Sequence, residues 1–431
     1  MKLNLYKKPK ALALLLVHFP LFLYSQNVRY SPDTLQATQT DAGLGTRVPQ
    51  LLFSGISHSG ASEHTRWYFP GALTQIQFNT VEGLVFNPAA SYTRQLRAGK
   101  FINLKPSVRY GVGNQRLNAH LEALYFYNPK QFAYAKLAGG RAMQQINDVS
   151  SLDGWGNTFN TLLYRRNFLK LYEATFLHLT HVSSPYKDVL FTTALHWEDR
   201  MPLQNLPRID DSSGRFTPNA PENVQLSDTR FPSHQAFLWH AQLTWQTDQG
   251  YTRRHGKFVP TSQAPAVTLA FTTTLSPLLG SDLSYQKLSL SIKDHYQVVS
   301  LGQGRVWVEA GDFLSQDSLS FVDYHHYNGN LSIYNTFDLN GFQLLDYYYY
   351  SNADFYVQGH LQHTFQPISL GKKPITVDPV VSAHYLYTDD VNYLELGVGA
   401  EKVLKNWRVE GYASFHDGKF DRLGFRFGFS M

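Results

Sequence analysis

Large apolar residues alternate with polar or small residues along many segments of this chain. In residues 237–245 the odd positions are aromatic residues, alanine or leucine, whereas His240, Gln242 and Thr244 lie between them. Successive side chains of a β-strand point to opposite faces, so this pattern predicts a strand with one apolar and one polar face. The same alternation recurs in residues 82–96, 101–112, 117–127, 171–180, 189–197, 267–275, 288–293, 330–339, 355–365, 393–401 and 423–431.

Most of these segments have the length of a tilted strand that crosses a bilayer, about 9–11 residues. The last of them alternates strictly, and the sequence stops there. A final strand that pairs with the first one is how an outer-membrane barrel closes. We therefore predict an all-β fold, a transmembrane antiparallel β-barrel of about 16 strands. A soluble β-sandwich or propeller also alternates, but no blade-like repeat is found.

The N-terminal residues resemble an export signal. Four lysines precede an apolar run over residues 11–24, and Ser25 follows at the expected cleavage position. The run is too short to span a bilayer as a helix, which needs about 20 residues. We expect residues 1–25 to be a cleaved signal peptide, 26–70 a periplasmic lead-in and 71–431 the barrel. The predicted location is the outer membrane of a Gram-negative bacterium.

One long stretch interrupts the alternation. Residues 199–233 are polar and contain five prolines. Connections longer than about 12–15 residues are usually functional or disordered. We expect this stretch to be a loop that lies outside the cell or folds into the barrel.

Composition narrows the class of partner. The formal net charge is +5, and removing the four lysines of the signal peptide leaves about +1 on the mature chain. This near-neutral balance gives no reason to expect nucleic acid. The chain has no cysteine, and aromatic residues make up 15% of it although the mean hydropathy is −0.30. Abundant aromatic residues without helix-like hydropathy are typical of barrels, whose membrane interfaces carry aromatic girdles.

Several strings without strand periodicity resemble an uncharacterised family of Gram-negative outer-membrane barrels. They include Asn-Thr-Val-Glu-Gly at residues 79–83 and Trp-Glu-Asp-Arg-Met-Pro-Leu at 197–203. The others lie at residues 164–173, 323–330, 344–348 and 359–363. The resemblance implies a barrel without an established activity. Longer members begin with a carboxypeptidase-like regulatory domain, which this chain lacks. A more distant similarity is to the barrels of outer-membrane assembly and two-partner secretion, although their Arg-Gly-aromatic motif is absent.

Catalytic and metal-binding motifs are not found. The 17 histidines show no zinc-type spacing, and His360 and His363 lie on opposite faces of their predicted strand. The sequence Gly55-Ile-Ser-His-Ser-Gly60 misses the spacing of a nucleophile elbow. We therefore predict no catalytic residue, no metal and no cofactor.

Polar and charged residues of inward parity are the candidates for lining the barrel interior. An arginine or lysine facing lipid near the midplane would cost about 2–4 kcal/mol, so these charges should point inward and pair. The candidates are His240, Tyr334, Gln358, His360, Glu395, Glu401, Arg408, Glu410 and Arg426. The run Tyr347–Tyr350 breaks the alternation and is expected at a membrane interface.

These patterns favour a non-enzymatic integral outer-membrane protein. The expected role is a channel or transporter, or assembly and export of surface components. Its expected contacts are outer-membrane lipid and periplasmic or lipoprotein partners. Two alternatives remain open: a surface hydrolase, either a protease or a phospholipase, and a scaffold for envelope proteins.

Overall fold

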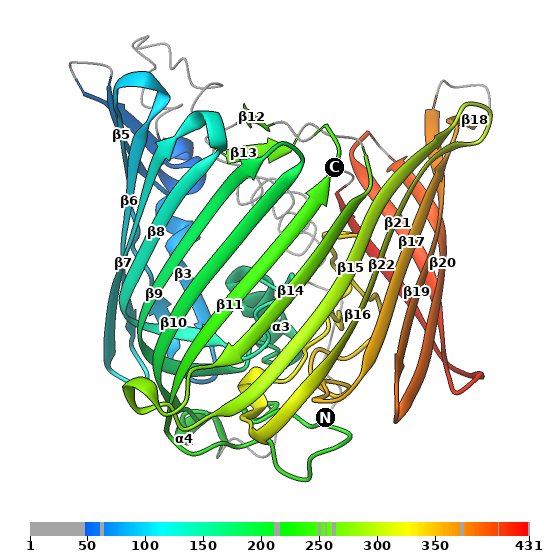
Figure 1. The fold of residues 1–431 in the computed structure, drawn as a ribbon. Coiled ribbons are helices and arrows are strands. Elements are labelled where there is room, and N and C mark those ends of the chain that lie inside the picture. Colours follow the sequence, from blue (N-terminus) through cyan, green and yellow to red (C-terminus); the bar gives the residue numbers. More distant parts are fainter. Residues whose placement is uncertain are drawn as a thin grey trace.

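The computed structural model describes residues 48–60, 64–210, 216–248, 251–254, 257–260, 264–370, 375–403 and 405–429. Twenty strands form one antiparallel sheet, and β12 and β13 form a separate hairpin. The sheet curves around an interior that contains helix α3 and a long segment without strands (Figure 1). The predicted signal peptide and the first part of the lead-in lie outside the described residues.

The bounds of the strands follow the chain. They are β1 (Ile56–Ser59), β2 (Thr65–Phe69), β3 (Ile76–Asn79), β4 (Gly83–Phe86), β5 (Ser91–Gln95), β6 (Phe101–Gly111), β7 (Arg116–Asn128), β8 (Ala133–Gln145), β9 (Leu171–Tyr186), β10 (Val189–Pro202), β11 (His234–Gln246), β12 (Tyr251–Arg254), β13 (Lys257–Pro260), β14 (Ala266–Thr274), β15 (Ser284–Val298), β16 (Gly302–Ser318), β17 (Tyr356–Phe365), β18 (Ile368–Leu370), β19 (Ile375–Thr388), β20 (Val391–Val403), β21 (Trp407–His416) and β22 (Lys419–Phe429).

The helical elements are few and short. They are η2 (Gln50–Ser54), η3 (Ala72–Gln75), η4 (Arg97–Gly99), η5 (Pro129–Gln131), α3 (Gly154–Tyr164), α4 (Pro207–Asp210), η6 (Leu278–Gly280) and η7 (Phe321–Asp323). Among the described residues, no helix has the length and apolar character that crossing a membrane requires.

The sheet is a meander interrupted near its start. Strand β6 pairs with β4 through Val85 and with β5 through Tyr92, so β4 and β5 are two pieces of one row. Pro88 lies between them and has no backbone N–H to donate, which interrupts the ladder. Strands β2 and β3 face these two pieces and form a second interrupted row. The sheet therefore contains more strands than the predicted 16, because two rows are broken and the short strands β1 and β18 are added. Strands β1 and β2 lie within the predicted lead-in, so the sheet begins before residue 71.

Burial on the strands is the reverse of that in a water-soluble sheet. On β20, Leu396 and Val398 are 47% and 67% exposed, whereas Glu395 is 0% exposed. The pattern repeats on β17, where His360 is 1% exposed and its apolar neighbour Leu361 is 40% exposed. Large apolar side chains thus cover the outside of the sheet, and polar side chains pack inside it. In water this arrangement would be unfavourable, because apolar area gains free energy from burial.

The prediction of a strand at residues 330–339 is wrong. The chain between β16 and β17, residues 319–355, contains no strand and folds into the interior (yellow in Figure 1). We call it the inserted segment. Its alternating stretch buries both polar Ser332 and apolar Phe337, so neither parity faces outward. The expectation that Tyr347–Tyr350 lies at a membrane interface is also wrong for Tyr347 and Tyr348, which are both 3% exposed in a core cluster inside the barrel.

The predicted long loop starts later than expected. Residues 199–202 continue β10, where Asp199 pairs with both Thr175 and Gln235. The loop proper is residues 203–233. Since consecutive strands are antiparallel, every second connection lies at the same end of the sheet. The three longest connections, residues 146–170, 203–233 and 319–355, therefore share one end.

Candidate functional site

The inserted segment and the polar side chains that hold it form the candidate functional site. Tyr327, Phe342 and Leu345 of the segment are at most 1% exposed and pack with Tyr356 of β17 and Tyr393 of β20. The segment is thus a folded filling of the barrel rather than a loose loop. Buried backbone in such a segment needs hydrogen-bond partners, and the strands around it supply them.

Glu395 provides the densest anchor. Its carboxylate accepts hydrogen bonds from the backbone N–H groups of Gln343, Leu344 and Leu345 at 2.6, 2.8 and 2.8 Å. The Tyr393 hydroxyl donates a further bond at 2.8 Å. Hydrogen bonds to a charged group are roughly twice as strong as neutral ones. One carboxylate on β20 therefore fixes three successive residues of the inserted segment.

The last strand holds the same part of the segment through its backbone. Arg426 on β22 donates from Nε to the Gln343 carbonyl at 2.7 Å and from Nη2 to the Asn330 carbonyl at 3.1 Å. The edge of β22 also forms a parallel bridge, in which Asn335 N donates to Phe427 O and Phe427 N donates to Ile333 O. Within the described residues, the outer edge of β22 pairs with the inserted segment and not with the first strands.

A buried ion pair fixes the start of the segment. Arg200 of β10 donates from Nη1 to Asp323 at 2.7 Å and from Nε to Glu198 at 2.6 Å. Tyr285 on β15 donates its hydroxyl to the other oxygen of Asp323 at 3.2 Å. Arg200 and Glu198 come from the string at residues 197–203 that carries the family resemblance. Breaking a buried pair leaves an uncompensated charge and costs about 3–5 kcal/mol.

His325 is held between three strands. Its Nδ1 lies 2.9 Å from Lys287 Nζ on β15, and its Nε2 lies 3.2 Å from Gln358 Nε2 on β17. Its ring stacks on Tyr356 with a centroid distance of 3.6 Å. These contacts fasten the segment to the wall opposite Asp323 and Glu395.

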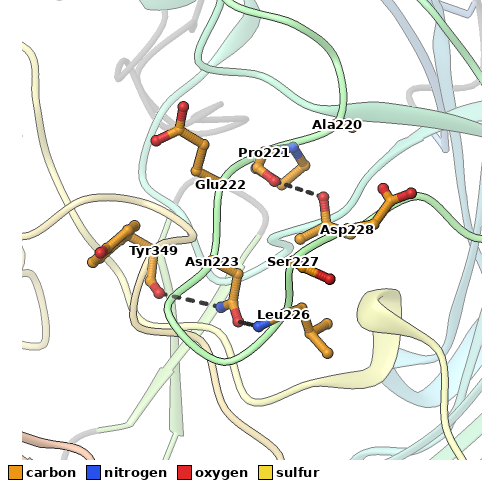
Figure 2. Close-up of a pocket in the computed structure, with 9 residues that line it drawn as sticks. Ala220, Pro221, Glu222, Asn223, Leu226, Ser227, Asp228 and Tyr349 are labelled. Carbon is orange, nitrogen blue, oxygen red and sulfur yellow. Dashed lines mark hydrogen bonds between the residues drawn. The ribbon is translucent and has the colours of Figure 1, made fainter.

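The loop 203–233 covers the inserted segment at the end where both emerge. Asn223 Nδ2 lies 3.0, 3.2 and 2.7 Å from the carbonyl oxygens of Tyr348, Tyr349 and Ser351. Figure 2 shows Asn223 reaching Tyr349 beside a cavity of about 410 Å³, with Glu222 and Asp228 at its rim. The sequence correctly predicts a long loop here, and in the structure it locks the inserted segment from one end.

Lys170 joins the same loop to the connection before β9. Its Nζ donates to the carbonyl oxygens of Asn167 and Pro218 at 2.6 and 2.7 Å. Burial away from water disfavours its charged form and lowers its pKa to about 7, although Asp346 and Glu222 act in the opposite direction.

The predicted interior residues fall into three groups. Glu395, Arg426 and Gln358 contact the inserted segment, as described. Arg408 forms ion pairs with Glu401 at 2.7 Å and with Glu410, and its guanidinium lies 4.3 Å from the Phe337 ring centroid. The inward pairing expected of these charges is therefore present.

The remaining predicted residues have different surroundings. His360 Nδ1 lies 2.8 Å from His384 Nδ1, and the Phe342 ring packs edge-on against His360. His240 lies on β11 and contacts only Thr272, at 2.9 Å, among the described hydrogen bonds. Tyr334 belongs to the inserted segment and packs edge-on against Phe427. That these residues line a water-filled lumen stays a prediction.

Three anchoring residues are missing from the sequence-based set. Lys287 has the same parity as Ser289 and Ser291, so the alternation of β15 could have identified it. Arg200 lies in the stretch interpreted as loop, and Asp323 lies outside any periodic segment, so neither carried a signal. In the part of the chain that the structure describes, no cluster of three or more metal-ligating side chains occurs. What the arrangement does chemically is to hold a peptide segment inside a barrel.

A large antiparallel sheet with an apolar exterior and a polar-anchored inserted segment defines the class of this protein. The chain belongs to the family described as "Family of unknown function (DUF5686) C-terminal domain", which matches residues 49–400. The family resemblance found in the sequence is thereby confirmed.

Solved structures of outer-membrane barrels are similar to this chain in fold. BamA from Haemophilus ducreyi lacking POTRA domains 1–3 has a TM-score of 0.45 at 11% identity, over 86% of this chain and 74% of that chain. CdiB from Acinetobacter baumannii has a TM-score of 0.39 at 8% identity, over 82% and 57%. A Rhodopseudomonas blastica porin mutant has a TM-score of 0.31 at 12% identity, over 79% and 88%. A comparison with curated proteins gave no match.

Proposed function

We propose that this protein is a non-enzymatic outer-membrane β-barrel that transports or exports envelope components through an interior closed by the inserted segment. The observation that carries this proposal is the reversed burial of the strands: apolar residues such as Val398 face outward, and charged residues such as Glu395 are buried inside. A lipid bilayer is the solvent in which this arrangement is stable. Joining the pieces of the two interrupted rows and leaving out β1 and β18 gives sixteen membrane-crossing rows of the twenty strands.

The loops indicate the orientation in the membrane. Barrels of this kind have short periplasmic turns and longer external loops. The three longest connections share one end, which we assign to the cell exterior. The chain ends of the barrel, at β1 and β22, lie toward the opposite end and face the periplasm. This is also where periplasmic or lipoprotein partners would bind.

The anchors of the inserted segment argue against a permanently open pore. Asp323, His325 and the backbone at residues 343–345 are bound to different strands, so displacing the segment breaks several buried polar contacts together. Each such contact is worth on the order of 1–3 kcal/mol. Thermal fluctuation alone would rarely release the segment. Transport therefore requires a partner or cargo that stabilises an open state.

Conductance in planar bilayers tests the proposal. We expect the purified full-length protein to be silent or to open rarely. A variant in which residues 327–348 are replaced by a short Gly-Ser linker should show steady conductance steps. The control carries Val299→Ser and Leu301→Ser in the exposed turn between β15 and β16 and should behave as the unmodified protein. Large constant conductance of the unmodified protein, or native solubility without detergent, would contradict the proposal.

A further inference from the structure

A small polar cavity lies between the first turn of α3 and the inserted segment. Its volume is about 120 Å³, and its walls come from residues 151–160 on one side and 328–347 on the other. Neutral amides, hydroxyls and a carboxylate supply most of its polar groups, among them Ser151, Asn160, Asn328, Asn330, Thr336 and Asp338. None of the anchors described above needs this cavity to be empty or filled.

The polar wall of the cavity is fixed by its own hydrogen bonds. Ser151 N donates to Asn328 Oδ1, and Asn328 Nδ2 donates to Ser151 Oγ, both at 2.9 Å. The Ser151 and Thr336 hydroxyls both donate to Asp338 Oδ2, at 2.6 and 2.8 Å. Because Oδ2 is occupied twice, the other oxygen, Oδ1, is left without a hydrogen bond from the described residues. It is therefore a preorganised acceptor.

Asn330 supplies the complementary donor. Its side-chain oxygen accepts from Ser332 N at 2.8 Å and from the Tyr347 hydroxyl at 3.2 Å. Its Nδ2 is buried and has no hydrogen-bond partner among the described residues, and Asn330 is only 7% exposed. A buried donor left unpaired costs about 1–3 kcal/mol. A ligand oxygen in the cavity would remove that cost.

The chemistry of the wall selects the class of ligand. Asp153 and Asp338 line the cavity and no lysine or arginine does, so an anion would be repelled. The cluster search that found no metal-ligating group of three within the described residues gives no support for a cation. Phe159, Tyr334 and Phe342 add aromatic surface. Amides and carboxylates beside aromatic rings suit a ligand whose hydroxyls both donate and accept hydrogen bonds.

The size of the cavity agrees with one sugar unit. At about 10–15 Å³ for each water position, the cavity holds about ten positions, close to the roughly twelve heavy atoms of a hexose. We propose that this cavity binds one neutral sugar unit, with Asn330 Nδ2 donating to one hydroxyl and Asp338 Oδ1 accepting from another. The site does not depend on whether the barrel conducts, so its failure would leave the proposed transport role untouched.

Saturation-transfer NMR on the full-length protein tests the site. The protein is held in a detergent without a sugar headgroup, and the probes are the methyl glycosides of glucose, galactose, mannose and N-acetylglucosamine. We expect at least one probe to receive saturation from the protein. Asn330→Asp keeps the size and the acceptor but removes the free donor, and Asp338→Asn replaces the free acceptor. Each should weaken binding about tenfold, the loss expected for one hydrogen bond to the ligand.

The control is Asn340→Asp, the same chemical change at an exposed residue of the inserted segment that does not line the cavity. It should bind as the unmodified protein does. Normal heat-modifiable gel mobility of every variant shows that the barrel is folded. The proposal is overturned if no glycoside binds, if Asn330→Asp and Asp338→Asn bind unchanged, or if inorganic phosphate binds in the cavity instead.

Discussion

Strand β20 and residues 330–339 of the inserted segment lie side by side in chemistry but not in structure. Both alternate apolar with polar residues. β20 has a neighbouring strand on each edge, β19 and β21, and presents Leu396 and Val398 outward. Residues 330–339 follow an Asn-Gly pair and precede another, and they bury Phe337 and Leu339 together with Ser332 and Asn335.

The difference shows what makes alternation into a membrane strand. A strand needs partners along both edges, because every backbone N–H and C=O in the bilayer must be satisfied. The inserted segment meets this need in another way, through side chains such as Glu395 and Arg426. The wall is therefore stabilised by backbone ladders and lipid contact, and the inserted segment by a few charged anchors. Single substitutions should separate the two.

The largest effect is expected at Glu395. Replacing it with alanine leaves the N–H groups of Gln343, Leu344 and Leu345 buried without an acceptor, which should destabilise the protein by about 3–5 kcal/mol. Urea unfolding in detergent measures this, and protease cleavage within residues 341–347 should become faster. Glu395→Gln keeps an acceptor oxygen and should lose less. Equal stability of the alanine variant and the unmodified protein would show that this anchor does not hold the segment.

A charge on the outer face of the same strand is the next test. Val398→Arg should destabilise the protein by about 2–4 kcal/mol if this face contacts lipid near the midplane. Folding into vesicles, followed by gel mobility, measures the loss. Asn340→Arg, at an exposed position of the inserted segment, should have little effect. If Val398→Arg folds as well as the control, the outer face does not meet lipid.

Sequence reasoning captured the wall better than its filling, and the two regions explain why. Period-two alternation identified β20, β22 and their inward charges Glu395 and Arg426, because a ladder imposes that period. Strand β8 escaped notice because alanine and glycine dominate it and weaken the contrast between its faces. The anchors Asp323 and Asn223 could not be found, because loop contacts across distant residues leave no local pattern. The same lack of period concealed the inserted segment itself.

A smaller effect is expected where the inserted segment packs against the connection before β9. The Tyr348 hydroxyl donates to Phe168 O at 3.1 Å and accepts from Lys170 N at 3.2 Å. Tyr348→Phe removes both bonds and keeps the ring, so we expect a loss of about 1 kcal/mol in the free energy of unfolding. Tyr349→Phe is the matched control, since Tyr349 is 37% exposed. A larger loss for the control would reverse the assignment of interior and exterior in this run.

The smallest effect is a pH dependence at Lys170, which links loop 203–233 to the rest of the site. Its pKa is about 7 in the folded protein and near 10.5 when unfolded, so the unfolded chain binds more protons between these values. Stability should therefore rise with pH through this window, with a gain of about 0.4 kcal/mol between about pH 6 and 7. Hydrogen exchange of the loop amides at residues 217–219 measures it. Lys170→Met should abolish this pH dependence, and the same slope in that variant would assign the dependence to another group.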